Sequence, residues 1–358
     1  MTTASPVSVR VAFDVMGGDH GPSEVVPGVL AYASDHPHDE LIMVGDQRTV
    51  RGLAGTMPAN VRIVHAGSVV GMDEHPARAL RDKKDSSILV ATDLVKRGEA
   101  DAVVTAGHTG AGMAAAILRL GRLPGVDRPG LAVQMVTASG PMVLIDIGAN
   151  PDSTPENLAQ FARMGQIFAE RVLGVSTPRV ALLSIGEERG KGDARIQRAT
   201  ELLESTSMRF IGNIEGKDLT RHAADVVVTD AVAGNVVIKF YEGLSTFIFD
   251  LWRAEFRSSL RGRLAYLLMR PGIGRIRSVF DYEKVGGSPL LGVKGTVIIT
   301  HGRAKRRMIG YACEVAATTA RSRVPELIAE ALAADAVAAA SNAEAPKTGE
   351  AATQEVST

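Results

Sequence analysis

Cysteine and aromatic residues are scarce in this 358-residue chain, which has one cysteine, one tryptophan and 4% aromatic residues in all. A single cysteine excludes an intramolecular disulfide and every Cys-x-x-Cys metal or redox motif. Scarce cysteine is typical of a protein from a reducing cytoplasm. Because Cys313 falls inside a predicted helix, over Ile309–Thr319, we interpret it as a small buried side chain and not as a nucleophile.

Net charge and long apolar segments are also lacking. The 40 lysines and arginines balance 40 aspartates and glutamates, so no overall field attracts nucleic acid and we expect no nucleic-acid partner. No apolar run reaches the roughly 18 residues that a transmembrane helix needs, and the N-terminus has no signal-peptide pattern. The sequence therefore predicts a cytoplasmic protein.

Several frequent catalytic signatures are missing as well. The chain has no G-x-S-x-G elbow, no H-E-x-x-H and no Cys/His pattern with metal spacing. Its first glycine-rich loop, Met16-Gly-Gly-Asp-His-Gly-Pro22, fits neither the dinucleotide nor the P-loop spacing. The loop either presents backbone N–H groups to an anion or is a tight turn that uses glycine for positive φ. We expect neither a metal nor a cofactor.

What the chain does have is a regular alternation of strand and helix patterns. Strands are predicted over Val9–Phe13, Leu41–Val44, Val61–Val64, Ala102–Thr105, Met142–Ile147, Arg179–Ile185, Phe210–Gly212, Val226–Thr229 and Thr296–Thr300. Helices are predicted over Ser23–Ala33, Ser87–Arg97, Thr109–Arg122, Pro155–Leu173, Asp193–Glu204 and Lys305–Thr319. This alternation predicts an α/β fold, a three-layer α/β/α domain with a mostly parallel sheet. We assign residues 1–335 to this single domain and residues 336–358, rich in alanine, glutamate, threonine and serine, to a disordered tail.

Polar, glycine-containing loops follow four of the predicted strands, at residues 106–111, 146–152, 186–193 and 230–235. Because the carboxyl ends of parallel strands share one edge of a sheet, we expect these loops to meet there, with residues 16–22, and to form an active site. They supply cations, amides and hydroxyls but no obvious covalent catalyst. This set favours transfer to or from a phosphate without an enzyme-bound intermediate.

Four loop residues are candidates for catalysis: Lys191, Asn235, Asp19 and His20. Lys191, between two glycines, is expected to contact phosphate or an oxyanion; the alternative is a solvated surface lysine. Asn235 begins a predicted helix, so it is an N-cap, a carbonyl donor, or both. Asp19 and His20 form a hydrogen-bonded pair that orients phosphate or moves a proton, or they only stabilise the turn.

The other polar loop residues are candidates for substrate binding. They are Gly17, Gly18, Lys83, Lys84, Ser86, Ser87, His108, Thr109, Gly110, Asn150 and Asp230. Lys83 and Lys84 precede two serines at a predicted helix start, a position that suits an anion. A run of charges is, however, more often a solvated face.

Taken together, these loops resemble those of the bacterial phosphate acyltransferase family. The matching segments, in family order, are Met16–Pro22, Lys83-Lys-Asp-Ser-Ser87, Ala106-Gly-His-Thr-Gly-Ala111, Asp146-Ile-Gly-Ala-Asn150, Phe210-Ile-Gly-Asn-Ile-Glu-Gly216, Asp225-Val-Val-Val-Thr-Asp230, Gly234-Asn235 and Gly286-Gly-Ser-Pro-Leu-Leu-Gly292. The resemblance implies an enzyme that makes acyl-phosphate from acyl-(acyl carrier protein) and inorganic phosphate for phospholipid synthesis. It also implies a homodimer, a downstream glycerol-phosphate acyltransferase, and a fold similar to phosphotransacetylases and isopropylmalate dehydrogenases.

Two positions depart from the family pattern. His108 stands where the family usually has asparagine, which keeps a hydrogen-bond donor and adds a titratable group. Asn150-Pro-Asp-Ser-Thr-Pro155 stands where the family usually reads Asn-Val-Asp-Cys-Lys-Pro. If that lysine holds phosphate in other members, its loss weakens the assignment of a phosphate site to this loop.

One segment interrupts the strand–helix alternation, and we expect a helical hairpin over about residues 243–280. Apolar residues recur there every four positions, at Ile248, Trp252, Phe256, Leu260, Leu264 and Leu268. Arginines lie beside this stripe, and Arg253, Arg257, Arg261, Arg303 and Arg306 are candidates for contact with the carrier protein or a membrane. The hairpin packs against a dimer mate, lies on an anionic membrane, or does both, as the family resemblance implies for a protein at the inner face of the cell membrane.

Two rival functions remain open from sequence alone. One is a phosphotransacetylase-like enzyme that uses short acyl chains and coenzyme A. The other is a catalytically silent module that binds an acyl carrier. A nicotinamide-dependent dehydrogenase of similar fold is disfavoured, because no dinucleotide fingerprint follows the first strand.

Overall fold

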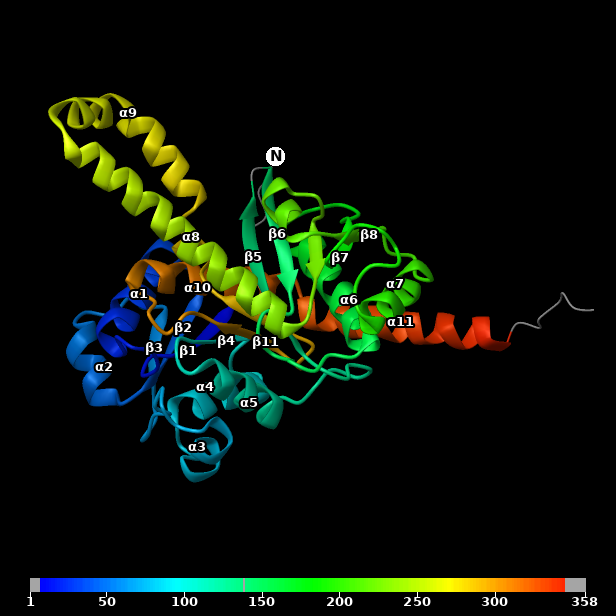
Figure 1. Ribbon diagram of the computed structural model, residues 1–358. Helices are drawn as coiled ribbons and strands as arrows, with labels where there is room; N and C mark the ends of the chain where they lie inside the picture. Colours follow the sequence, from blue (N-terminus) through cyan, green and yellow to red (C-terminus); the bar gives the residue numbers. More distant parts are fainter. Residues whose placement is uncertain (1–6, 138, 345–358) are drawn as a thin grey trace, which may run out of the picture.

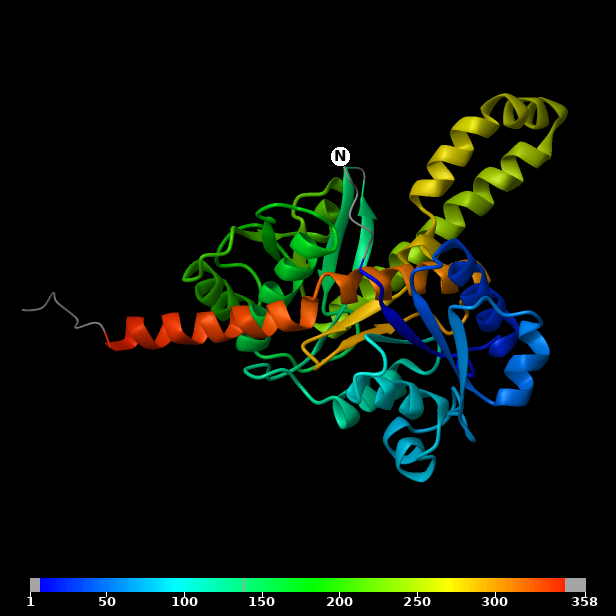
Figure 2. The ribbon, with the colours of Figure 1, turned by 180° about the vertical axis from the view of Figure 1, so that it is seen from behind.

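The computed structural model describes residues 7–137 and 139–344. Within these residues, one sheet of eleven strands has the order β3-β2-β1-β4-β11-β10-β5-β6-β9-β7-β8. Its strands are β1 (Arg10–Asp14), β2 (Glu40–Gly45), β3 (Val61–His65), β4 (Ala102–Thr105), β5 (Gly130–Thr137), β6 (Gly140–Ile145), β7 (Val180–Leu183), β8 (Phe210–Ile214), β9 (Val226–Val228), β10 (Ser288–Leu291) and β11 (Thr296–Ile299). Helices cover both faces of the sheet (Figures 1 and 2), so the predicted three-layer α/β/α fold is confirmed.

The helices lie on the two faces in a regular way. They are α1 (Pro22–Asp35), α2 (Gln47–Ala54), α3 (Pro76–Asp82), α4 (Ser87–Lys96), α5 (Thr109–Arg119), α6 (Pro155–Arg171), α7 (Ala194–Glu204), α8 (Ala231–Ser258), α9 (Leu260–Val279), α10 (Arg306–Arg321) and α11 (Val324–Glu344), with short 3₁₀ helices η1 (Gly216–Arg221) and η2 (Tyr282–Val285). In the first half, α1 and α10 share a core with Val11 and Phe13 on one face, and α4 and α5 share a core with Ala12 on the other. In the second half, α6, α7 and α11 form one core, and part of α8 packs on the opposite face.

Strand direction reverses at the centre of the sheet, which the sequence does not reveal. Strands β3, β2, β1, β4 and β11 are parallel, and so are β6, β9, β7 and β8. Between them, β10 is antiparallel to β11 and β5, and β5 is antiparallel to β6. The two parallel halves therefore run in opposite directions. The carboxyl ends of β6, β9 and β7 therefore point opposite to those of β1, β4 and β11, so the polar loops do not share one edge of a parallel sheet. Ile147 and Gly148 after β6 and Asn235 after β9 nevertheless line one cavity together with residues after β1, β4 and β11.

The predicted strands are all present with small shifts at their ends. The predicted strand Arg179–Ile185, for example, ends at Leu183, and Ile185 is 83% exposed. Four elements were not predicted, the two antiparallel strands at the centre, β5 and β10, and the short helices α2 and α3, and the long helix α11 was not predicted either. Strands β5 and β10 do not begin βαβ units, so the strand–helix alternation gives no signal for them.

The C-terminal segment differs from the prediction up to Glu344. Residues 336–344, assigned to a disordered tail, continue α11 in the structure. Val324 and Ile328 anchor the start of this helix in the core with α6, and the alanine-rich sequence that follows has the highest intrinsic helix propensity. The rest of the predicted tail, 345–358, lies outside the described residues.

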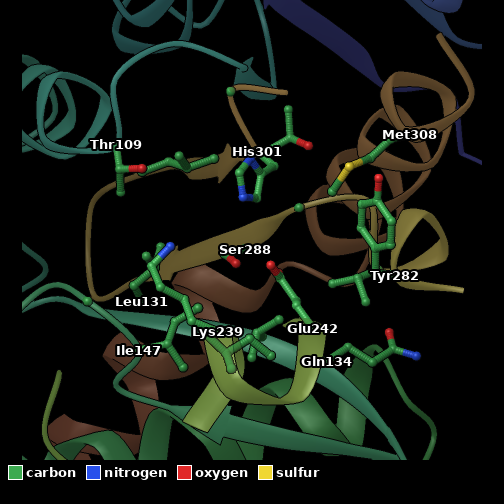
Figure 3. Close-up of a pocket in the computed structure, with 18 of the residues that line it drawn as sticks. Thr109, Leu131, Gln134, Ile147, Lys239, Glu242, Tyr282, Ser288, His301 and Met308 are labelled. Atoms are coloured by element: carbon green, nitrogen blue, oxygen red, sulfur yellow. The ribbon is translucent and has the colours of Figure 1, made fainter. Parts of the chain in front are cut away.

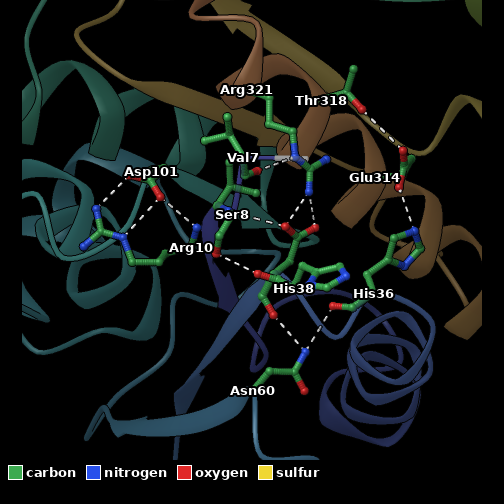
Figure 4. Close-up of polar contacts among 12 residues, drawn as sticks. Val7, Ser8, Arg10, His36, His38, Asn60, Asp101, Glu314, Thr318 and Arg321 are labelled. Carbon is green, nitrogen blue, oxygen red and sulfur yellow. Dashed lines mark hydrogen bonds and ion pairs between the residues drawn. The ribbon is translucent and has the colours of Figure 1, made fainter. Parts of the chain in front are cut away.

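Polar side chains link the segments at the amino-terminal ends of the strands in the first half of the sheet (Figure 4). Arg321 of α10 pairs with Asp39 and donates to the carbonyl of Val7. Asn60 donates from Nδ2 to the carbonyls of Ala33, His36 and Asp39, at 2.8–3.2 Å. These bonds hold the edge that lies away from the glycine loops.

Helices α8 and α9 form the predicted hairpin, which projects from the body of the molecule (Figure 1). The hairpin extends further toward the N-terminus than the predicted boundary at 243, because α8 is continuous from Ala231. Ser259 separates the two helices and accepts a hydrogen bond from the Gly262 N–H at 3.0 Å, which caps α9. No helix of the described residues has both the length and the apolar composition to cross a bilayer.

Candidate functional site

A cavity of about 470 Å³ lies where the two halves of the sheet meet (Figure 3). Asp19, Gly107 and Thr109 line it from the loops after β1 and β4, and Thr300, His301 and Gly302 line it from the end of β11. Strand β5 supplies an apolar wall that includes Leu131, Val133 and Met135. Helix α8 crosses from the second half and adds Asn235, Ile238, Lys239 and Glu242. The crossing of α8 brings residues of both halves to one site despite the reversed strand direction.

Glycines allow the three loops of the first half to touch. A Cβ on Gly17 would lie 2.8 Å from Cα of Gly107, closer than packed atoms tolerate. Gly18 has φ of +92°, which a side chain rarely adopts. The next residue, Asp19, donates its backbone N–H to the carbonyl of Gly302 at 2.8 Å. The expected tight turn is therefore also a close approach between backbones.

A buried carboxylate, Asp14, fixes these loops from below. It accepts hydrogen bonds from Thr105 Oγ1 at 2.8 Å and from the Met16 N–H at 3.3 Å. Thr105 Oγ1 in turn accepts from the Gly107 N–H at 3.0 Å. Burial raises the pKa of Asp14, because the charged form loses its hydration. Asp14 and Thr105 thus join the ends of β1 and β4 under the glycine loops.

His301 projects into the cavity from the end of β11 (Figure 3). Its Nδ1 accepts a hydrogen bond from the Arg303 N–H at 3.3 Å. Burial lowers the pKa of His301, and the charge of Arg303 lowers it further, whereas Glu242 and Asp19 act in the opposite direction. The ring is therefore neutral at pH 7 and carries its proton on Nε2.

The charged groups of the cavity come mainly from α8 and the segment after the hairpin. Arg303 bonds Glu242 at 2.9 Å, and its guanidinium lies 5.2 Å from the ring centre of Tyr282. Lys239 is the one lysine or arginine among the described lining residues. No group of three or more His, Cys, Asp or Glu side chains in the described part of the chain is arranged as metal ligands would be.

Three of the predicted site residues line this cavity: Asp19, Thr109 and Asn235. Asn235 is not the N-cap of its helix, because α8 begins four residues earlier. The cap is Asp230, whose Oδ1 accepts from the N–H groups of Val232 and Ala233 at 2.9 Å. Asp230 Oδ2 also bonds Arg195 at 2.8 Å. The carboxylate assigned to substrate binding is therefore used within the fold.

Other predicted binding residues also have structural partners. His108 caps α5, with Nδ1 accepting from the Gly110 N–H at 3.0 Å. Asn150 is buried and donates to the Pro129 carbonyl at 2.7 Å and to Asp146 at 2.8 Å. Neither side chain lines the cavity.

The predicted anion site at Lys83 and Lys84 is not built as expected. The Lys83 ammonium bonds both carboxylate oxygens of Glu74, at 2.6 and 2.8 Å, and the Val69 carbonyl at 2.8 Å. Ser86 and Ser87 are fully buried at the start of α4. The charge of Lys83 is thus already paired with Glu74, whereas Lys84 is exposed.

Lys191 and His20 lie apart from the cavity lining. Lys191 sits in the loop after β7, where its side chain passes over Gly186. His20 is exposed, and no hydrogen bond joins it to Asp19 among the described contacts, so the predicted Asp19–His20 pair is not formed. Asp19 alone turns toward the cavity.

Sequence reasoning missed His301, Lys239 and Glu242. A signal for His301 was present, because Thr300-His301-Gly302 follows a predicted strand as the other candidate loops do. Lys239 and Glu242 carry no local signal. Their relevance depends on which face of α8 meets the sheet, and this follows only from the path of the helix across β5.

Comparisons with known proteins agree with this architecture. The model of a family described as "Fatty acid synthesis protein" matches residues 9–327. A phosphate acyltransferase of Desulfitobacterium hafniense is 47% identical over 311 residues, which cover 86% of this chain and 93% of the relative. One of Heliobacterium modesticaldum is 46% identical over 312 residues, covering 86% and 93%.

Solved structures with a similar fold include two acyl-transferring enzymes. A phosphotransacetylase from Streptococcus pyogenes superposes with a TM-score of 0.61 at 18% identity, covering 87% of this chain and 94% of its own. A branched-chain phosphotransacylase from Enterococcus faecalis V583 has a TM-score of 0.56 at 15% identity, covering 87% and 99%. At this identity the likeness shows the fold alone.

Proposed function

The chain belongs to the phosphate acyltransferase family, and we propose that it transfers a fatty acyl group from acyl-(acyl carrier protein) to inorganic phosphate. The product would be an acyl-phosphate, consumed by a downstream glycerol-phosphate acyltransferase in phospholipid synthesis. The observation that carries the proposal is the two-part character of the cavity. An apolar wall suits an acyl chain, and a polar end built from glycine loops suits phosphate.

Two further cavities continue from the first one along the hairpin, and their linings combine aromatic side chains with charged ones such as Arg253 and Arg277. Beyond the first cavity, a second of about 500 Å³ shares Tyr241, Phe280 and Tyr282 with it. A third, of about 240 Å³, follows between α8 and α9 and is lined by Trp252 and Phe256. This run of cavities along the hairpin supports a long-chain donor over the two-carbon group of a phosphotransacetylase.

The reaction needs no covalent enzyme intermediate, because a thioester is already an activated acyl donor. An oxygen of monohydrogen phosphate attacks the carbonyl carbon and forms a C–O bond, and the carbonyl oxygen becomes an oxyanion. The C–S bond then breaks, and the thiolate takes up the proton that phosphate gives up. The products are acyl-phosphate and free carrier thiol, so the protein only has to align the reactants and stabilise the oxyanion.

We assign phosphate to the polar end of the cavity. Lys239 supplies a positive charge, and Asn235 supplies an amide N–H donor one turn earlier on α8. Helix α5 begins at Thr109, and the backbone N–H groups of its first turn are further donors for an anion. Asp19 also lines this cavity, and its carboxylate would accept a hydrogen bond from the P–O–H group of monohydrogen phosphate. Lys191 is the alternative cation, and its place outside the lining makes it the weaker candidate.

Two basic surfaces are proposed contacts for partners. Arg303 contacts Glu242 of the cavity lining at 2.9 Å, and Arg306, at the start of α10, bonds Glu24 at 2.8 Å. An acidic carrier protein would compete with these bonds. Arg253, Arg257 and Arg261 lie on the hairpin next to exposed leucines of α9. We propose that the hairpin attaches a cytoplasmic enzyme to the anionic inner face of the cell membrane.

The activity is tested with purified full-length protein, phosphate, and either long-chain acyl-(acyl carrier protein) or acyl-coenzyme A. Acyl-phosphate is trapped with hydroxylamine and quantified. Formation from the carrier-bound donor, with slower turnover of short acyl-coenzyme A, supports the proposal. Preference for the short coenzyme A donor would instead indicate a phosphotransacetylase-like enzyme, and binding of the carrier without product would indicate a silent module.

A further inference from the structure

His301 occupies a position in the cavity that the reaction has not yet used. It projects from the end of β11 into the space between the apolar wall of β5 and the polar loops (Figure 3). The loop around it is fixed, because the Gly302 carbonyl accepts from the Asp19 N–H at 2.8 Å and the His301 carbonyl accepts from the Ala304 N–H at 2.8 Å. The imidazole is thus presented from a rigid turn, at the border where an acyl carbonyl would meet phosphate.

The hydrogen bond at Nδ1 determines what the ring can donate. Because Nδ1 accepts from the Arg303 N–H at 3.3 Å, the single proton of the neutral ring resides on Nε2. The surroundings favour this neutral form, through burial and through the charges of Arg303 and Lys239, against the opposing charges of Glu242 and Asp19. A neutral imidazole does not release its proton near pH 7, so its Nε2–H acts as a hydrogen-bond donor and not as a general acid.

We infer that His301 donates its Nε2–H to the thioester carbonyl oxygen and stabilises the oxyanion that forms when phosphate attacks. The inference rests on the proposed function and assigns a further catalytic residue to it. The step moves no proton through His301: the new bond is phosphate oxygen to carbonyl carbon, the broken bond is carbon to sulfur, and the phosphate proton goes to the thiolate. Neutral donors aimed at developing negative charge are effective because they need no reorganisation during the reaction.

A chain of contacts holds the donor in place. Arg303, which supplies the N–H to Nδ1, is bonded through its guanidinium to Glu242 at 2.9 Å and lies over the ring of Tyr282. Glu242 therefore draws the positive charge of Arg303 toward α8 and away from the acyl carbonyl. We treat Arg303 and Glu242 as positioning residues, because their effect on the reaction passes through the ring of His301.

The test compares three variants with wild type, using the acyl-phosphate assay and full-length protein. His301→Ala removes the donor. His301→Gln retains a neutral N–H close to the position of Nε2. His38→Gln is the matched control, because His38 is exposed and lies at the opposite edge of the first half of the sheet. Circular dichroism and thermal melting of each variant report whether the fold is retained.

We expect His301→Ala to lower kcat by about 10²–10³, as for loss of one oxyanion donor. His301→Gln should recover at least about tenfold of this loss, with little change in the KM for phosphate, since the donor acts in the transition state. His38→Gln should match wild type. Wild-type turnover in folded His301→Ala, or equal loss in the alanine and glutamine variants, overturns the donor role. Absence of acyl-phosphate with wild type contradicts the proposed function instead.

A second measurement does not depend on the folding of any variant. Infrared spectra of wild-type protein with a ¹³C-carbonyl thioester donor, taken without phosphate, report polarisation of the bound carbonyl. A donor at Nε2 lowers the carbonyl stretching frequency relative to the free thioester. An unshifted band from the bound donor would overturn the inference.

Discussion

Asp14 illustrates how single buried residues shape the site. It ends β1 and carries no direct role in the proposed reaction, yet it accepts from Thr105 and from the backbone of the glycine loop. A polar group placed in the core is tolerated only when such partners are present. The sequence marks Asp14 only as the end of an apolar run, and its partner Thr105 is 91 residues away in the chain.

The first prediction concerns which lysine binds phosphate. Lys239→Ala should lower kcat/KM for phosphate by about 10²–10³, because the cation acts on charge that develops in the transition state. Lys239→Arg should retain part of the activity. Lys191→Ala should retain most of it, since Lys191 does not line the cavity. Steady-state kinetics with phosphate as the varied substrate makes the comparison, and the reverse ranking would move the phosphate site to the loop after β7.

The second prediction concerns Cys313. Its thiol is fully buried, and burial raises its pKa far above neutrality, so no reactive thiolate forms. Cys313→Ser should therefore keep near-normal turnover while lowering stability by about 1–3 kcal/mol if the new hydroxyl finds no partner. Turnover and thermal melting are measured together, with Cys313→Ala as the apolar control. A folded serine variant without activity would revive a covalent mechanism.

The third prediction concerns pH. The pKa of His301 lies below its usual range, so the ring is neutral above that pKa and charged below it. Protonation puts a hydrogen on Nδ1, which can then no longer accept the hydrogen bond from the Arg303 N–H. The two N–H groups repel each other, so we expect the ring to turn and its Nε2–H to move away from the thioester carbonyl. The ratio of wild-type to His301→Gln turnover should therefore stay constant through the ordinary histidine pKa of about 6.5 and fall only at lower pH, because the lowered pKa delays protonation of the ring. Using a ratio removes the titration of phosphate, which affects both proteins equally.

At the scale of elements, α8 has two faces with different partners. One face looks into the cavities and packs toward α9, where Phe256 of α8 contacts Tyr266 of α9 at 5.6 Å between ring centres. Phe249 and Trp252, both of α8, contact each other on this face at 5.6 Å. On α9 the predicted apolar stripe stays exposed, with Leu260 at 82% and Leu268 at 75%. The apolar stripe is continuous in the sequence, but in the structure its α8 part includes Phe256, which packs against α9, whereas its α9 part is exposed.

The fourth prediction concerns the hairpin and lipid. Each arginine near an anionic membrane surface contributes roughly 1 kcal/mol to the free energy of membrane binding, and salt weakens this electrostatic contribution. Arg257→Glu with Arg261→Glu should therefore reduce flotation with phosphatidylglycerol-containing vesicles and leave turnover of the water-soluble carrier-bound donor largely intact. Arg48→Glu with Arg51→Glu on α2 makes the same charge change on an exposed helix away from the hairpin. Equal loss in both variants, or binding to neutral vesicles alone, would contradict attachment through the hairpin.

How much the sequence reveals depends on how local each signal is. Strands that begin βαβ units, such as β1 and β4, show in their apolar runs and in the glycine loops that follow. Strands β5 and β10 do not, since their pairing joins residues near 130 to residues near 290. The loops after β1 and β4, which the sequence assigns to the site, contribute residues to the cavity lining. Lys239 of α8 was missed because its place depends on that central pairing.

At the scale of the whole molecule, the site exists only because the two opposed half-sheets are joined. Strand β5 contributes the apolar wall and α8 carries polar groups across to the glycine loops of the other half. The outer face of α8 is left uncovered in the single chain, with a row of exposed apolar residues at Val232, Val236, Phe240, Phe247 and Leu251. Contiguous exposed apolar surface of this kind marks an interface.

The last prediction is that this outer face of α8 forms the proposed homodimer. Phe240 is 67% exposed and Phe247 59%, and a twofold contact would bury both residues of each copy against the same surface of the other. Light scattering after gel filtration should give a dimer mass for wild type and a monomer mass for Phe240→Asp with Phe247→Asp. Leu264→Asp with Leu268→Asp, on the α9 surface assigned to lipid, is the matched control and should remain dimeric. If the dimer persists in the α8 variant and is lost in the α9 variant, the prediction is contradicted. The α9 surface of the hairpin would then be the subunit contact, and the outer face of α8 would not.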